Sequence, residues 1–124
     1  NANGVMVAEN LNQLHSEFKN LGKQQSLTEN GTIVNGRGDS PNEHDILTGS
    51  TLDGRTVDDG QNHTCSNWTS NADGEGTAQV GHFDRTGGGQ NPTSWNSAHG
   101  SRGCSQENLV ATGGAGYFYC FAID

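Results

Sequence analysis

Apolar residues recur with helical spacing near the start of the chain, at intervals of three and four positions. The residues of this face are Leu11, Leu14, Phe18 and Leu21. Asn10 is suited to cap such a helix, with Gln13 at the capping-box partner position. Gly22 is suited to end it. The pattern therefore predicts a helix that packs its apolar face on a core.

A short apolar run at residues 5–8 precedes this helix and predicts a strand. When Val7 is added to the helical face, the spacing also fits a heptad, so a trimeric stalk is an alternative. A heptad pattern needs about three or four repeats to indicate a coiled coil, and this one covers barely two. A core-facing helix is the favoured interpretation.

The rest of the pattern predicts short strands separated by polar loops. The dipeptide Asn30-Gly31 has apolar residues on both sides, which predicts a hairpin with a two-residue turn. Beyond Asn35 no helical period remains. Strand candidates then occur at residues 45–49, 64–70, 77–83 and 116–123, and the loops between them cover residues 50–63, 70–76 and 84–94. Loops of this length inside a compact domain are often functional.

Composition decides between a folded domain and a disordered chain. Only 29% of the 124 residues are hydrophobic and the net charge is −8, values that approach those of disordered proteins. Two Trp, two Tyr, four Phe and three Cys favour a folded, loop-rich domain. We expect a single α+β domain over residues 1–124, with a strand, helix and hairpin in 1–35 and a loop-rich strand core in 36–124.

The charge excludes some functions. Phosphate binding needs clustered Lys and Arg, and here six such residues are scattered. No apolar run approaches the roughly 20 residues of a membrane span. No signal peptide precedes Asn1, so we expect that any leader or upstream domain has been removed or lies outside this sequence. Nucleic acid and membrane insertion are therefore not expected.

Several stretches together resemble a known fold. "HDILTGSTLDGR", "TCSNWTS", "GTAQVGH", "SWNSAH", "GCSQENLV" and "YFYCFA" resemble the C-terminal half of the endostatin-like, C-type-lectin-like fold. The chain is more similar still to secreted bacterial lectin-like proteins of that fold, from about Asn3 to its end. The resemblance implies short antiparallel strands, one N-terminal helix and long irregular loops. Such proteins usually carry an upstream helix with a cysteine, which this sequence lacks.

The resemblance also implies roles for the last strand and the cysteines. The strand at 116–123 would cross the centre of the domain with both faces buried. Three cysteines allow one disulfide, either Cys65–Cys104 or Cys104–Cys120, or three free thiols. The resemblance favours Cys65–Cys104 and leaves Cys120 as a buried thiol. A disulfide indicates an oxidising compartment, so we expect an extracellular, cell-surface or periplasmic location.

Metal-binding patterns are incomplete in the sequence. Asn71, Asp73 and Glu75 begin like a calcium loop, but the twelfth position is His82 instead of Glu. The stretch 90–97 only partly resembles the sugar-binding calcium motifs of C-type lectins. The five His show no zinc spacing, and His82 with Asp84 is interpreted as a hydrogen-bonded structural pair. We therefore expect no metal or cofactor, with calcium as the alternative.

Two further features have structural and functional interpretations. The tripeptide at 37–39 matches the integrin-binding segment of matrix proteins, but a turn at Gly38, with Arg37 and Asp39 bonded to nearby backbone, is favoured. Trp68 is expected in the core. Trp95 fits core or ligand site equally well. No nucleophile elbow, phosphate loop or tuned pair of carboxylates is present, so we do not expect an enzyme.

These observations favour a non-enzymatic recognition module that binds a glycan or a surface protein through its long loops. The residues predicted to bind ligand are Asp84, Arg85, Gln90, Asn91, Trp95 and Asn96. An aromatic face with a few polar groups is the usual composition of a small-ligand site. The alternative is a structural or assembly module, such as the tip of a homotrimeric fibre or adhesin.

Overall fold

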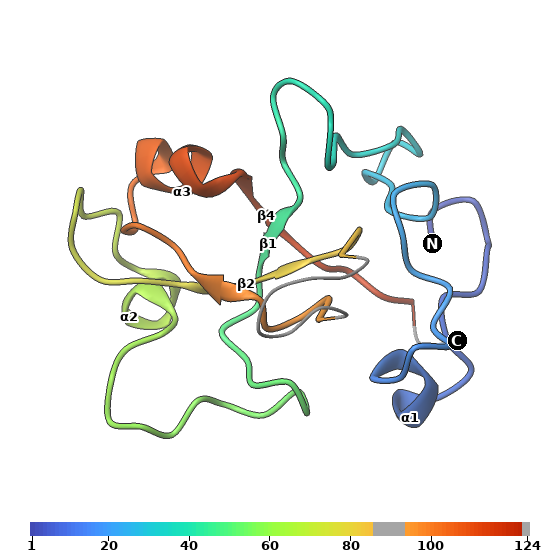
Figure 1. Ribbon diagram of the computed structural model, residues 1–124, viewed down its shortest axis with the longest axis horizontal. Helices are drawn as coiled ribbons and strands as arrows, with labels where there is room; N and C mark the ends of the chain where they lie inside the picture. The colour runs from blue at the N-terminus through green and yellow to red at the C-terminus, as the bar shows by residue number, and fades with distance from the viewer. Residues whose placement is uncertain (86–93, 123–124) are drawn as a thin grey trace.

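The computed structural model describes residues 1–85 and 94–122. Within them the chain forms a small α+β domain around a four-stranded sheet with the order β3-β2-β1-β4 (Figure 1). The strands are β1 (Asp45–Leu47), β2 (Gln79–His82), β3 (His99–Gly100) and β4 (Gly114–Phe118). β2 runs antiparallel to β1 and β3, whereas β4 runs parallel to β1. The expected short antiparallel strands are therefore present in β1, β2 and β3, and the expectation is wrong for β4, because β4 follows a helix that returns the chain in the direction of β1.

Two small apolar clusters hold the sheet. Ile46 packs with Val34 and Phe83. Its neighbour Leu47 packs on the other cluster, formed by Ala78 and the disulfide-bonded cysteines. Neighbouring residues of a strand point to opposite faces, so β1 contributes one side chain to each cluster.

Helix α3 (Gln106–Thr112) leads directly into β4 (Figure 1). The Ser105 side chain accepts a hydrogen bond from the backbone N–H of Asn108, which caps the helix, and Leu109 is buried. We did not predict this helix. A capping Ser before "QENLV" was the available signal.

Helix α1 (Leu11–Leu14) is much shorter than the predicted helix over residues 11–21. Asn10 caps it as expected and accepts a hydrogen bond from the Gln13 backbone. The Ser16 hydroxyl then bonds the Gln13 carbonyl and the Phe18 N–H, an alternative to continued helix that Ser often provides. Leu11 is 74% exposed and Phe18 is 82% exposed, so these two residues of the predicted core-facing side do not pack on a core, whereas Leu21 packs against the cluster of Val34, Ile46 and Phe83.

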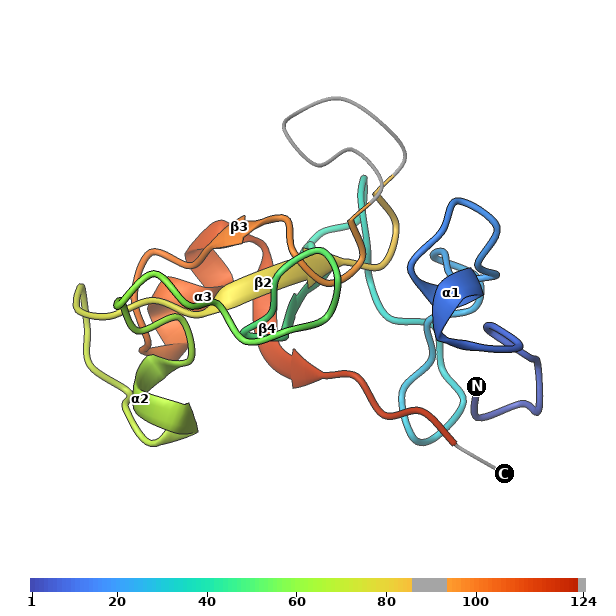
Figure 2. The same ribbon diagram turned by 90° about the horizontal axis from the view of Figure 1, so that it is seen from below.

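The residues around α1 differ from the predictions in a second way. Residues 5–8 form no strand, and Val5 and Met6 are exposed. Both views place this N-terminal part at the end of the molecule opposite α2 and α3 (Figures 1 and 2). A strand needs a neighbouring strand for its backbone groups. Here the carbonyl oxygens of residues 5–7 accept hydrogen bonds from Asn1 and Asn20 instead.

The segment predicted as a strand at 64–70 is instead the one-turn element α2 (Cys65–Trp68). All four of its residues have positive φ, between 48° and 65°, so the turn is left-handed. Side-chain hydrogen bonds to backbone compete with strand pairing here, because the Thr64 hydroxyl accepts from the Asn67 N–H. Trp68 is 39% exposed and meets Phe118 edge-on, with ring centroids 5.2 Å apart, so its expected place in the core is wrong.

The C-terminal strand also differs from the expectation. β4 ends at Phe118 and lies at the edge of the sheet, not across its centre. Phe118 and Phe121 are exposed, as is the free thiol of Cys120. Because the chain leaves the sheet after Phe118, the two faces of the segment 116–123 are not both buried as predicted. The predicted disulfide Cys65–Cys104 is confirmed.

The hairpin at residues 27–33 is present as one antiparallel bridge between Leu27 and Ile33. Its turn is not the predicted two-residue turn. The Gly31 N–H donates to the Thr28 carbonyl, and the positive φ, 78°, falls on Gly31 and not on Asn30. A three-residue loop that ends on a left-handed glycine has these features.

Gly31→Ala should therefore lower the free energy of unfolding by about 1–2 kcal/mol, the cost of a left-handed conformation with a Cβ. Asn30→Ala is the matched control and should change it by less than about 0.5 kcal/mol. Urea unfolding measures both. If Asn30→Ala lowered the free energy of unfolding as much as Gly31→Ala, the result would favour the two-residue turn over the three-residue loop.

Candidate functional site

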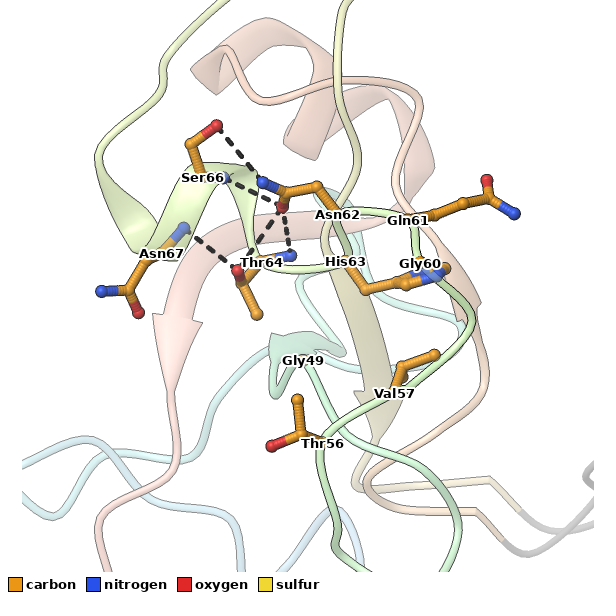
Figure 3. Close-up of a pocket in the computed structure, with 10 residues that line it drawn as sticks. All are labelled: Gly49, Thr56, Val57, Gly60, Gln61, Asn62, His63, Thr64, Ser66 and Asn67. Atoms are coloured by element: carbon orange, nitrogen blue, oxygen red, sulfur yellow. Dashed lines mark hydrogen bonds between the residues drawn. The ribbon is translucent and has the colours of Figure 1, made fainter.

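A pocket of about 410 Å³ lies between the loop 50–64 and the left-handed turn α2 (Figure 3). Its volume is within the range of small-ligand sites. It is lined by Gly49, Thr56, Val57, Gly60, Gln61, Asn62, His63, Thr64, Ser66 and Asn67. The loop is one of the long polar loops that the sequence marked as candidates for function.

Short-range hydrogen bonds shape the wall on the α2 side. The Asn62 side-chain oxygen accepts from the backbone N–H groups of Thr64 and Ser66, both at 3.0 Å (Figure 3). The Thr64 hydroxyl accepts from the Asn67 N–H. Because the Asn62 and Thr64 side chains accept these hydrogen bonds from the backbone, they hold the turn α2 in place.

The disulfide and the sheet anchor the same wall. Cys65 is joined to Cys104, 39 residues further along the chain. Thr64 also forms an antiparallel bridge with Ala78, the residue before β2. Left-handed backbone in non-glycine residues costs about 1–2 kcal/mol each and persists where the surroundings impose it. This wall therefore combines a strained backbone with rigid anchors.

Seven of the ten described lining residues carry an amide, a hydroxyl or an imidazole, the other three are Val57 and two glycines, and none is Asp, Glu, Lys or Arg. The imidazole of His63 is itself paired with Asp59 at 3.0 Å. Such a surface can donate and accept hydrogen bonds without a net charge. It suits a neutral polar ligand better than a phosphate or a carboxylate.

The loop predicted to bind ligand is described only at its ends. Gln90 and Asn91 lie outside the described residues. Asp84 accepts hydrogen bonds from the Arg37 backbone and from His44. The Arg85 guanidinium lies 3.3 Å from His82 Nδ1.

The other end of that loop is held inside the protein. Asn96 is 3% exposed, and its amide donates to the carbonyls of Thr51 and Leu52. The Trp95 ring packs edge-on against Tyr119 and Phe121. Trp95 and Asn96 thus act as packing and bridging residues in this structure.

The 37–39 segment is a turn, as the structural interpretation predicted. Asp39 accepts from the Gly36 N–H at 2.8 Å and pairs with Lys23. The hydrogen bond from Lys23, followed by that from the Gly36 backbone, lowers the pKa of the Asp39 carboxyl. The Asp39 carboxylate of the tripeptide is therefore already hydrogen-bonded and ion-paired within the chain.

The calcium-like stretch at residues 71–75 contributes a structural contact. Its Asp73 accepts a hydrogen bond from the Ser105 hydroxyl.

A cluster of His and Asp side chains forms a second candidate site, on the sheet. The β1–β2 register places Asp45 directly opposite His82, and β3 brings His99 alongside. From Asp45 Oδ1, the Nε2 atoms of His82, His99 and His44 lie at 2.7, 3.5 and 3.6 Å. The rings of His44 and His82 stack at 4.0 Å. In the described part of the chain, His44, Asp45 and His82 are the one group of three or more His, Cys, Asp or Glu side chains close enough to share a metal ion.

The electrostatics of this cluster follow from its burial. Asp45 is 2% exposed. Burial raises the pKa of its carboxyl, but the contacts with His82 and His99 outweigh burial and hold that pKa at about 2. The same carboxylate raises the pKa of His99. Burial also raises the pKa of Asp84, yet His44 and the Arg37 N–H outweigh it and lower that pKa.

Sequence reasoning missed this cluster. The predicted pair of His82 with Asp84 is wrong, because His82 contacts Asp45 while Asp84 contacts His44. The three His are far apart in the sequence and show no ligand spacing. The adjacent His44-Asp45 at the start of a strand candidate was the one local signal.

Comparison of the chain with known protein families, with curated proteins and with solved structures found no match. The likeness to the C-type-lectin-like fold therefore rests on the sequence motifs alone. In residues 1–85 and 94–122 no helix has the length and apolar character needed to cross a bilayer. The disulfide favours an oxidising compartment.

Proposed function

We propose that this chain is a non-enzymatic extracellular recognition domain that binds a neutral polar ligand, such as a glycan, in the pocket beside α2. One observation carries the proposal: a cavity of about 410 Å³ is lined by amides and hydroxyls and by no charged carboxylate, ammonium or guanidinium among its described residues. A neutral sugar presents hydroxyl groups that need such donors and acceptors.

The rigidity of the pocket wall on the α2 side supports the same proposal. A binding wall that is already held in place loses less conformational entropy when the ligand binds. The disulfide at Cys65 and the hydrogen bonds of Asn62 and Thr64 provide that rigidity. The strained φ values of α2 are of the kind that cluster at ligand sites.

The pocket is tested by removing side chains that do not hold the turn. In the double variant Gln61→Ala/Asn67→Gly, two amides are lost, and glycine tolerates the left-handed backbone at position 67 without strain. We expect affinity for a ligand found on a glycan array to fall roughly tenfold or more, because each lost hydrogen bond contributes about 0.5–1.5 kcal/mol. The melting temperature should stay unchanged.

Two control variants sharpen this test. Asn12→Ala/Gln24→Ala removes two exposed amides away from the pocket and should leave binding intact. Gln90→Ala/Asn91→Ala tests the loop that the sequence favoured. If the loop variant weakens binding and the pocket variant does not, the ligand site belongs to the loop. An array without hits would contradict glycan recognition itself.

A specific observation favours a second function, that of an assembly module. The N-terminal part exposes Val5, Met6, Leu11 and Phe18. Clustered exposed apolar side chains often mark a surface that another chain covers. Sedimentation equilibrium separates the two functions, because a stable trimer of this chain favours assembly and a monomer favours recognition by a single domain.

A further inference from the structure

We propose that His44, Asp45 and His82 bind a divalent transition-metal cation of the zinc type, with His99 in position to act as the fourth ligand. None of these four residues lines the pocket beside α2.

The donor atoms have the separations of a metal site. One ligand atom from each of His44, Asp45 and His82 lies within 4.8 Å of the other two. His99 Nε2 is 3.5 Å from Asp45 Oδ1 and 3.0 Å from His82 Nε2. In a tetrahedral zinc site with bonds of about 2.0–2.2 Å, neighbouring donor atoms lie roughly 3.3–3.6 Å apart. Small side-chain movements would therefore open room for one ion.

Hydrogen bonds at Nδ1 determine which nitrogen of the His44 and His99 rings would bind a metal. His44 Nδ1 lies 2.7 Å from Asp84, and His99 Nδ1 lies 3.0 Å from the Gly100 carbonyl. Both partners are acceptors, so each Nδ1 carries the proton and each neutral ring has its lone pair on Nε2. The Nε2 atoms of His44 and His99 lie 3.6 and 3.5 Å from Asp45 Oδ1, and that of His99 also lies 3.0 Å from His82 Nε2. A cation between them would bind these ring nitrogens and the carboxylate oxygen.

The Asp45 carboxylate also indicates a cation site. Both of its carboxylate oxygens are buried, and neither accepts a well-directed hydrogen bond from the described residues. Buried carboxylate oxygens are normally hydrogen-bonded or metal-bound. The carboxylate lies at the centre of the cluster, 2.7 Å from His82 Nε2. It is therefore positioned as the anionic ligand of the ion.

Asp84 and Gly100 have the roles of supporting groups. A metal-bound His usually donates its other N–H to a carboxylate or a backbone carbonyl, which fixes the ring and increases its basicity. For His44 this partner is the Asp84 carboxylate, and for His99 it is the Gly100 carbonyl. Nitrogen-rich donor sets of this kind prefer zinc, nickel or copper to calcium, which binds oxygen ligands.

Arg85 would oppose the metal. Its guanidinium can only donate, so the 3.3 Å contact makes His82 Nδ1 the acceptor and leaves the proton on Nε2 of the neutral ring. A metal on Nε2 requires the proton to move to Nδ1, and then Arg85 must turn away. Removing the guanidinium should therefore strengthen metal binding.

The test is a titration of the chelator-treated 124-residue chain with Zn²⁺ by isothermal calorimetry. We expect one ion per chain. His44→Gln and His82→Gln should each weaken binding by roughly 100-fold or more, and Asp84→Asn by about 10–100-fold. Arg85→Gln should bind Zn²⁺ more tightly than the unchanged chain. Circular dichroism of each variant without metal establishes that it is folded.

His63→Gln is the matched control, because His63 pairs with Asp59 on the surface at 3.0 Å, outside the cluster. Zn²⁺ affinity should be unchanged in this variant. The visible spectrum of bound Co²⁺ provides a separate readout, since a four-coordinate nitrogen-rich site differs from a hydrated ion. Absence of binding, binding lost with His63 instead of His82, or a six-coordinate Co²⁺ spectrum would each overturn the proposal.

Discussion

The double variant Cys65→Ala/Cys104→Ala is expected to lose about 3–4 kcal/mol of unfolding free energy. The bond closes a loop between residues 39 positions apart, and cutting it returns the entropy of that loop to the unfolded chain. Two further consequences act in the same direction. The two cysteines and Ala78 form one of the two buried apolar clusters, and the strained turn α2 loses its covalent anchor. A domain with so small a core has little stability with which to offset the loss.

Urea unfolding, monitored by tryptophan fluorescence, measures this change. Cys120→Ala is the matched control, because Cys120 is exposed and free, and it should change stability by less than about 0.5 kcal/mol. Equal stability of the double variant and the unchanged chain would mean that the 65–104 bond does not form in solution.

The second large effect is expected from Gly81→Ala in the middle of β2. A Cβ at this position would lie 1.7 Å from the Trp95 carbonyl oxygen and 2.5 Å from Asn96 Cα. These are backbone atoms, so no side-chain rotation relieves the clash. The segment at residues 94–97 would have to move away from the sheet, and it carries the buried amide of Asn96. We expect a loss of about 3 kcal/mol or more, beyond the usual range for overpacking.

Thermal unfolding followed by circular dichroism measures this effect. Gly22→Ala is the control, because its φ is not positive and its new Cβ would meet only the flexible end of Gln25 at 3.2 Å. That change should stay within about 0.5 kcal/mol. A mild effect at Gly81 would show that the 94–97 segment does not pack on β2 in solution.

Local patterns predicted the central strands well. β1 and β2 lie inside the strand candidates at 45–49 and 77–83, because short apolar runs between turn residues need little context. The cap at Asn10 and the location of the hairpin at residues 27–33 were also predicted. The disulfide pairing came from the resemblance and not from spacing, since three cysteines leave the pairing open.

Local patterns failed where neighbouring side chains or the rest of the fold decided the backbone. Residues 64–70 read as a strand, but the side chains of Asn62 and Thr64 bond the backbone into a left-handed turn. Residues 11–21 have helical spacing, but a helix of this length needs a packed face to persist, and none covers Leu11.

Composition and short sequence patterns were enough to predict the class of the protein, an acidic, loop-rich α+β domain with short strands. Such properties depend on composition and on runs of a few residues. The candidate sites, in contrast, depend on contacts that form only in the folded chain. Asp45, His82 and His99 meet only because three strands pair in a particular register, and the pocket exists only because a loop closes over a strained turn. Contacts between distant residues depend on how the strands pair, which local sequence does not encode.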